Sequence, residues 1–285
     1  MKIKILSYTN DPERLIATAA KLCYAGCDIE QLMEKQTPEA VEKFITMLSE
    51  MGHESPLEHV SFTFAIEGVS RITEQQLTRH RIASYSIQSG RYVNRDNAQF
   101  YMPADIKDCE EASEIYTSVI EHSKKAYEEL TNELMYHYIV ADKMDPTNDR
   151  SYPEGLDDHL YGTIDHYKEN YKQVYNAFQK KAIENARCVF PNSLETKIVC
   201  TMNVRTLLNF FKHRCCHRAQ DEIKALAKLM LREVRKICPI IFKYAGPACI
   251  SGICPEGKMQ CVQLKGKIPT NLEVKELIAK YFVKY

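Results

Sequence analysis

The sequence predicts an α+β fold. Helix-like and strand-like segments interleave along the 285 residues without the regular alternation of a parallel βαβ sheet. The strand signal is clearest in HVSFTFAI, residues 59–66, where apolar residues recur at every second position. The helix signals are clearest at Asp11-Pro12 and Thr37-Pro38, because each pair offers a capping side chain before a proline at the first helical position.

The same criteria place the elements of the N-terminal half. Gly52 ends the helix that begins after Thr37, because glycine readily takes the left-handed backbone conformation of a helix C-terminus. We expect elements at residues 2–8 (strand), 12–24 (helix), 38–51 (helix), 59–66 (strand) and 71–78 (helix). Their predicted apolar faces comprise Val41, Phe44, Ile45 and Leu48 in the second helix and Val60, Phe62, Phe64 and Ile66 in the second strand.

Helices dominate the C-terminal half. Between Asp145 and Gly162, turn-forming residues and acids predict a loop. We expect helices at 110–142, 165–187, 203–213 and 219–237, and a strand at 193–201. The helical period in the last helix predicts a buried face made of Ile223, Leu226, Met230, Val234 and Ile237.

The charge balance excludes some classes of function. Lysine plus arginine and aspartate plus glutamate number 38 each, so a general nucleic-acid binder is not expected and any anion site must be local. No run approaches the roughly 18 apolar residues of a membrane span, and the N-terminus lacks the apolar core of a signal peptide. We therefore predict a cytoplasmic protein without nucleic-acid or membrane partners, whose eleven cysteines are reduced thiols.

One short segment concentrates positive charge. The stretch RHRIASYSIQSGRYV, residues 79–93, contains arginines and hydroxyls but no acid, whereas the sequence has neither G-x-G-x-x-G nor G-x-x-x-x-G-K-[ST]. Arginine matches phosphate with a planar fork of donors and can stack on a flat ring. If the segment is extended, Arg79 and Arg81 face one way and His80 the other. Alone, an R-H-R motif would indicate a solvated charged face.

The segment GHESPLEH, residues 52–59, has two interpretations. It is typical of a helix end followed by a turn, in which Ser55 could donate a hydrogen bond to a phosphate. A metal site is less favoured, because His53, Glu58 and His59 lack the i, i+4 spacing of ligands on one helix.

Residues 187–223 form the third candidate segment. On a helix Arg205 and Asn209 share a face, as do Arg214 and Arg218. The side chains of Asn203, Asn209 and Arg214 could bind the polar edge of an aromatic heterocycle. The alternative is an amphipathic helix with capping asparagines.

The cysteines give weak signals. Cys215 and Cys216 adjoin His217, but nucleophilic catalysis depends on spatial geometry rather than adjacency. The later cysteines contain no C-x-x-C pair, so a structural zinc site is not favoured and we predict no metal.

In combination these segments resemble the flavin-dependent thymidylate synthases (ThyX). RHRIASYSIQS fits that family's signature of R-H-R, seven residues and Ser. GHESPLEHVSFTF, RCVFPNS and NVRTLLNFFKHRCCHRAQDEI resemble its other blocks in the right order, so the resemblance covers about residues 1–250. It implies FAD-dependent methylation of dUMP to dTMP, with 5,10-methylenetetrahydrofolate as carbon donor and NADPH as reductant.

The resemblance also implies an architecture. We expect an α+β fold with a mostly antiparallel sheet flanked by helices, assembled as a homotetramer whose subunits share active sites. Residues 1–245 would form the catalytic domain, with a loop insertion at 145–164, and residues 246–285 a Cys-rich extension packed on that domain.

Site residues follow from the matched positions. The implied FAD contacts are Ser55, Arg79, His80, Arg81, Asn203, Arg205 and Asn209. The implied dUMP contacts are Gln76, Arg79, Ile87, Gln88, Ser89, Gly90, Arg91, Arg187 and Arg214. Arg214 would be the catalytic residue that activates the pyrimidine, because a fixed cation can stabilise negative charge on the ring.

Two positions depart from the family pattern. Ile87 cannot supply the carboxylate that some members carry there, so Gln88 is expected to take over its polar contact. Asp221 stands where many members have tryptophan. Two other functions stay open: another pyrimidine-methylating enzyme, for instance one with a cysteine nucleophile, and a non-enzymatic RNA-binding module, against which the zero net charge argues.

Overall fold

The structure is a computed structural model that describes residues 1–91, 97–151, 160–250 and 254–261. The chain divides into two compact units. Unit 1 comprises residues 1–69, 73–86 and 197–285, and unit 2 comprises residues 70–72 and 87–196. The boundary near residue 245 stays a prediction.

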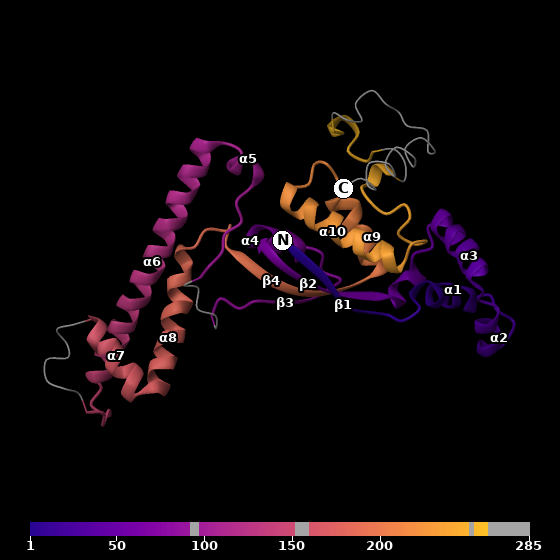
Figure 1. Ribbon diagram of the computed structural model, residues 1–285. Helices are drawn as coiled ribbons and strands as arrows, with labels where there is room; N and C mark the ends of the chain where they lie inside the picture. The colour runs from indigo at the N-terminus through magenta and orange to yellow at the C-terminus, as the bar shows by residue number, and fades with distance from the viewer. Residues whose placement is uncertain (92–96, 152–159, 251–253, 262–285) are drawn as a thin grey trace. The chain divides into compact units, whose positions relative to one another are not determined.

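Unit 1 is built on a four-stranded sheet with the strand order β1-β2-β4-β3 (Figure 1). The strands are β1 (Lys2–Tyr8), β2 (Ser61–Ser70), β3 (Ser84–Ile87) and β4 (Glu195–Asn203). β1 runs antiparallel to β2, with Ile3 opposite Ile66 and Ile5 opposite Phe64. The strand predicted at 2–8 is confirmed. The strand predicted at 59–66 begins two residues later and extends to Ser70, and the strand predicted at 193–201 lies two residues later.

Two helices, α9 (Val204–Arg214) and α10 (Asp221–Ile237), cover one face of this sheet (Figure 1). The predicted strand face, Val60, Phe62, Phe64 and Ile66, is fully buried beneath them. Of the predicted α10 face, four members are buried and Ile237 is half-buried. Aromatic contacts join the layers, since Phe242 lies edge-on to both Phe62 and Phe211. The α+β fold class with an antiparallel sheet is therefore confirmed.

The N-terminal helices of unit 1 are α1 (Pro12–Leu22), α2 (Ile29–Glu34) and α3 (Pro38–Met51). α3 begins and ends as expected, because the Thr37 hydroxyl accepts the Ala40 N–H and Gly52 takes a left-handed φ of 71°. The expected cap of α1 is wrong. Asp11 has a left-handed φ of 41° and makes no side-chain cap, and its carboxylate lies 3.7 Å from the Arg14 guanidinium instead.

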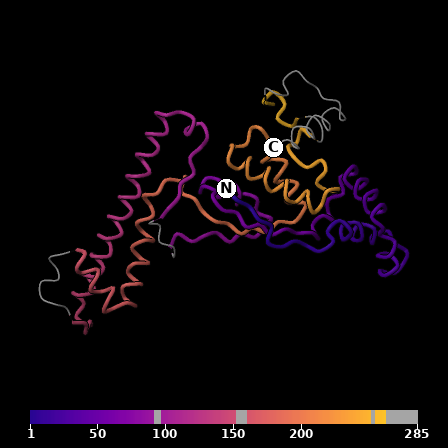
Figure 2. The backbone as a smooth tube through the Cα atoms, in the orientation of Figure 1, coloured from indigo at the N-terminus to yellow at the C-terminus, as the bar shows by residue number. Residues whose placement is uncertain are grey.

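Unit 2 contains a long helix, α6 (Glu110–Lys143), which follows the short α5 (Ala104–Lys107). Helices α7 (Leu160–Asn170) and α8 (Lys172–Ala186) pack against α6, as the backbone trace shows (Figure 2). Their shared core consists of Met135, Ile139, Ile164, Tyr167 and Ala182. A single helix was expected at 165–187, but Tyr171 leaves the helical conformation there and separates two helices. No glycine or proline marks that break in the sequence.

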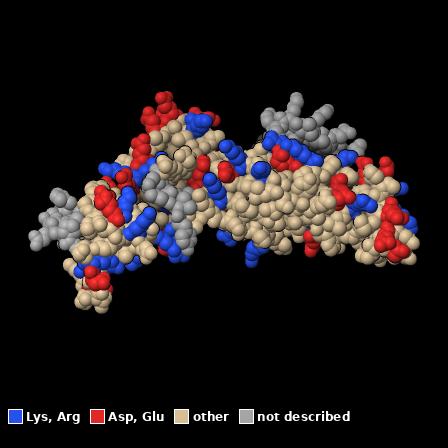
Figure 3. Space-filling view, turned by 60° about the horizontal axis from the view of Figure 1, so that its bottom comes forward, with Lys and Arg blue, Asp and Glu red and all other residues tan. Residues whose placement is uncertain are grey.

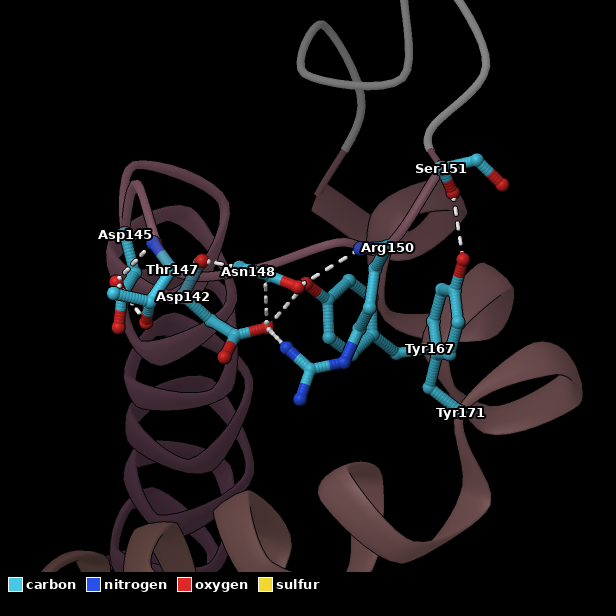
Figure 4. Close-up of polar contacts among 8 residues, drawn as sticks. All are labelled: Asp142, Asp145, Thr147, Asn148, Arg150, Ser151, Tyr167 and Tyr171. Atoms are coloured by element: carbon cyan, nitrogen blue, oxygen red, sulfur yellow. Dashed lines mark hydrogen bonds and ion pairs between the residues drawn. The ribbon is translucent and has the colours of Figure 1, made fainter.

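The segment after α6 is joined to it by a polar cluster (Figure 4). The Asp142 carboxylate accepts from Arg150 Nη1 at 2.7 Å and from the Tyr167 hydroxyl at 2.8 Å. Asn148 donates to the carbonyl and the carboxylate of the same aspartate. We call these four residues the Asp142 cluster.

The predicted loop at 145–164 is corrected at its end. Residues 160–164 are helical, because Thr163 and Ile164 are buried in the core of unit 2 despite the neighbouring Gly162. Residues 152–159 of this expected loop lie outside the described residues.

Basic and acidic side chains both occur on the visible face of the molecule (Figure 3), in keeping with their equal numbers in the sequence. In the described part of the chain, no helix is both long enough and apolar enough to cross a bilayer.

Candidate functional site

Helix α9 gathers two segments that are distant from it in the sequence. At its start, the Val204 N–H donates to the Val60 carbonyl at 2.8 Å. Two residues later, the Thr206 hydroxyl donates to the Ile82 carbonyl at 3.1 Å. The residues before β2 and those after α4 (Arg71–Leu77) therefore lie along α9. This arrangement brings together the expected flavin contacts, all of which belong to unit 1.

The first turn of α9 is ordered by its own cap. The Asn203 side chain accepts the Thr206 N–H at 2.8 Å, so this asparagine has the capping role that the sequence also allowed. Arg205 and Asn209 are exposed on the same face of the helix, as predicted. Ser55 begins the short 3₁₀ helix Ser55–His59, which contacts α9.

Arg205 already has two carboxylate partners. Its guanidinium lies 3.1 Å from the Glu54 carboxylate and 2.5 Å from that of Glu58. These hydrogen bonds raise the pKa of Arg205 above its ordinary value. The charge of Arg205 is thus balanced by the same 52–59 segment that carries Ser55.

The R-H-R segment has the predicted alternation. Arg79 and Arg81 are exposed, and in the described part of the chain neither has an ion-pair partner. His80 turns the other way and is half-buried, with its ring edge-on to Phe210 at a centroid distance of 5.0 Å. The two arginines are therefore available to an anion, whereas the histidine packs against Phe210.

Arg214, the last residue of α9, lies against His80. Its Nε–H donates to His80 Nε2 at 3.2 Å, and an Nη2–H donates to the Gln76 carbonyl at 3.4 Å. Burial, together with the positive charge of Arg214, lowers the pKa of His80 to about 4. The expected helix face shared by Arg214 and Arg218 is wrong, because α9 ends at Arg214 and Arg218 lies in the following turn.

Sequence reasoning missed Gln220. Its side-chain oxygen accepts from Gln76 Nε2 at 2.5 Å, which orients the amide of an expected substrate contact. The only sequence signal for Gln220 is its place in HRAQDEI, directly before α10.

The remaining expected dUMP contacts belong to unit 2. Ile87 ends β3 and is followed by Gln88. The Ser89 hydroxyl accepts the Arg91 N–H at 3.2 Å, which closes a turn around Gly90. A Cβ at Gly90 would lie 2.9 Å from Arg187 Nη1, so only glycine lets that guanidinium approach the backbone this closely.

Arg91 is held by an acid that the sequence did not suggest. Its Nε lies 2.7 Å from the Glu184 carboxylate. Glu184 comes from α8, so only the fold brings the two side chains together.

All eleven cysteines are unpaired. Burial raises the pKa values of the Cys200 and Cys215 thiols to about 12, which leaves almost no thiolate for nucleophilic attack. In the parts of the chain that the structure describes, no group of three His, Cys, Asp or Glu side chains is arranged to hold a metal ion.

Comparisons with known proteins identify the family. A family model described as thymidylate synthase complementing protein matches residues 4–240. A flavin-dependent thymidylate synthase of Clostridium tetani is 48% identical over 261 residues, which cover 92% of this chain and 93% of that protein. One of Geobacter sulfurreducens is 40% identical over 263 residues, covering 92% and 94%. One of Pyrococcus furiosus is 37% identical over 262 residues, covering 90% of each. The chain therefore belongs to the family of the flavin-dependent thymidylate synthases.

Proposed function

We propose that this protein methylates dUMP to dTMP in the cytoplasm, with 5,10-methylenetetrahydrofolate as carbon donor, FAD as cofactor and NADPH as reductant. Family membership supports the reaction. The structural observation that carries the proposal is the position of Arg214. This arginine lies at the end of α9, where it contacts the R-H-R segment through His80.

The residues along α9 fit a flavin dinucleotide. Arg79 and Arg81 are exposed guanidinium groups without ion-pair partners in the described part of the chain, as a pyrophosphate group requires. Ser55 and Asn209 add neutral hydrogen-bonding groups near the same helix. Arg205 fits an anionic ligand least well of these residues, because Glu54 and Glu58 already balance its charge. When bound, FAD supplies the hydride chemistry.

Arg214 is proposed to act on the pyrimidine ring of dUMP. Uracil C5 is a poor nucleophile until negative charge builds up on N3 and the C4 oxygen. A guanidinium whose plane is fixed stabilises that charge without reorganisation, which makes it more effective than a mobile cation. Burial lowers the pKa of Arg214, but arginine starts so far above neutrality that it stays charged.

The Ser89–Arg91 turn and Arg187 are proposed to bind the dUMP phosphate. The close approach of Arg187 to the Gly90 backbone concentrates donors at one place. Glu184 holds Arg91 in place through its Nε at 2.7 Å. Gln76, Arg79, Ile87 and Gln88 complete the proposed contacts, and a homotetramer in which neighbouring subunits complete each site is part of the same proposal.

The experiment is a spectroscopic titration followed by an assay. The purified protein is expected to be yellow, and addition of dUMP should perturb the flavin spectrum. With dUMP, methylenetetrahydrofolate and NADPH together, dTMP should form, and omission of any one should stop it. A colourless protein that gains no activity when FAD is added would contradict the proposal.

A further inference from the structure

The guanidinium of Arg214 is held from two sides in unit 1. Nε donates to His80 Nε2 at 3.2 Å, and Nη2 donates to the Gln76 carbonyl at 3.4 Å. Two acceptors on different atoms fix both the position and the rotation of the planar group. In the described part of the chain the other N–H groups of Arg214, including both on Nη1, have no hydrogen-bond partner. They are therefore the donors that can meet a ligand.

His80 is itself held in place. Its ring lies edge-on to Phe210, with a centroid distance of 5.0 Å and an interplanar angle of 84°. Its carbonyl accepts from the Tyr85 hydroxyl at 2.8 Å, and the same hydroxyl lies 2.8 Å from the Leu77 carbonyl. The backbone N–H of His80 donates to the Leu77 carbonyl at 3.1 Å. The imidazole is thus fixed at the ring and at the backbone.

We propose that His80 is a positioning residue for the methylation of dUMP, which sets the guanidinium plane of Arg214 by accepting its Nε–H. This role differs from the flavin contact that the family resemblance implied for His80. It requires a neutral ring, because a protonated imidazole has no acceptor. The low pKa of His80, about 4, provides that neutral ring at every pH at which the enzyme is expected to work.

The inference rests on the proposed function of Arg214, and it is tested with two replacements. In His80→Leu the acceptor is lost while an apolar side chain remains against Phe210. In His80→Gln the side-chain oxygen can accept the Nε–H near the position of Nε2. Methyl transfer in a single turnover should fall about 100-fold in His80→Leu, the scale expected for a misplaced reacting group, and should largely recover in His80→Gln.

The readouts separate positioning from flavin binding. In His80→Leu the bound flavin and the rate of flavin reduction by NADPH should stay close to wild type. In the double variant with Arg214→Ala, the replacement His80→Leu should lower the rate of methyl transfer little further, because the two residues act as one unit. Loss of flavin, an equal fall in flavin reduction, or additive losses in the double variant would overturn the inference. His213→Leu is the matched control, since this exposed histidine makes no hydrogen bond to Arg214 in the described chain.

A measurement that needs no turnover distinguishes this inference from the proposed function. The Nε–H of Arg214 should give a protected nitrogen-15 resonance in the wild type, absent in Arg214→Lys and exchange-broadened in His80→Leu. If wild-type protein makes no dTMP but keeps this signature, the proposed function fails and the contact stands. An unchanged Arg214 resonance in His80→Leu would refute the hydrogen bond from Arg214 to His80, even in an active enzyme.

Discussion

Arg214 combines a long side chain, partial burial and a fixed guanidinium plane. The protein holds it with His80 and the Gln76 carbonyl rather than with a carboxylate. A carboxylate would neutralise the charge that the proposed reaction needs, as Glu54 and Glu58 do for Arg205. Neutral acceptors fix the geometry and leave the charge available.

Replacement of Arg214 should therefore separate the two half-reactions. In Arg214→Ala we expect FAD to stay bound, dUMP binding to weaken, and methyl transfer at saturating dUMP to fall about 100- to 1,000-fold, as for the loss of one preorganised donor. Arg214→Lys should recover little, since a compact ammonium cannot reproduce the planar fork of donors that a guanidinium presents. Single-turnover kinetics measure both steps. Equal slowing of flavin reduction and methyl transfer would contradict this role.

His80 should stay neutral to unusually low pH. Its pKa of about 4 in the folded protein lies below that of an unfolded histidine, because of burial first and the charges of Arg214 and His213 second. The neutral ring of His80 therefore makes its full contribution to the free energy of unfolding above the unfolded-state pKa of about 6.5. This contribution is lost as the pH falls from about 6.5 towards 4. An NMR titration of the imidazole C–H should show the low midpoint. A midpoint near 6.5 in the folded protein would show that the ring is neither buried nor hydrogen-bonded to Arg214.

At the scale of elements, the Asp142 cluster lies at the C-terminal end of α6 and holds the segment that follows this helix against it (Figure 4). Asp142 and Arg150 are mostly buried, with 16% and 26% of their side chains exposed. Their ion pair and the Tyr167 hydroxyl join α6 to α7. Because this pair is mostly buried, breaking it should cost more unfolding free energy than breaking the exposed pairs along the helix surfaces.

Disruption of the cluster should therefore lower stability. Asp142→Ala leaves the Arg150 charge without its partner and should cost about 2–3 kcal/mol of unfolding free energy, less than for a fully buried pair. Tyr167→Phe removes one hydrogen bond and should cost about 1 kcal/mol. Lys125→Ala, at an exposed i, i+4 pair with Glu129, is the control and should cost under about 0.5 kcal/mol. Urea unfolding of each variant measures these differences, and equal costs for Asp142→Ala and Lys125→Ala would contradict the argument.

At the scale of the whole molecule, the proposed contacts fall into two groups. Arg79 and Arg214 belong to unit 1, whereas Ser89 and Arg187 belong to unit 2. In the proposed homotetramer, neighbouring subunits complete each site.

Assembly should therefore control flavin retention. The native protein is expected to elute as a tetramer with bound FAD in size-exclusion chromatography with light scattering. Conditions that dissociate it to monomers should release the flavin in parallel, because the proposed sites are shared between subunits. A monomer that keeps one FAD per chain would rule out shared sites.

The sequence by itself determined the local elements. Thr37-Pro38 and Gly52 bound α3, and the alternation in HVSFTFAI gave the buried face of β2, because caps and periodicity act over a few residues. It also placed the site segments in order, through motifs that resemble a family.

The tertiary structure alone decided the rest. The break at Tyr171 and the helical start at Leu160 have no local signal; they follow from burying Ile164 and Tyr167 against α6. The contacts of His80 with Arg214 join residues 134 positions apart, and those of Gln76 with Gln220 join residues 144 apart. Such contacts depend on where α9 and α10 lie on the sheet, so no local pattern in the chain could specify them.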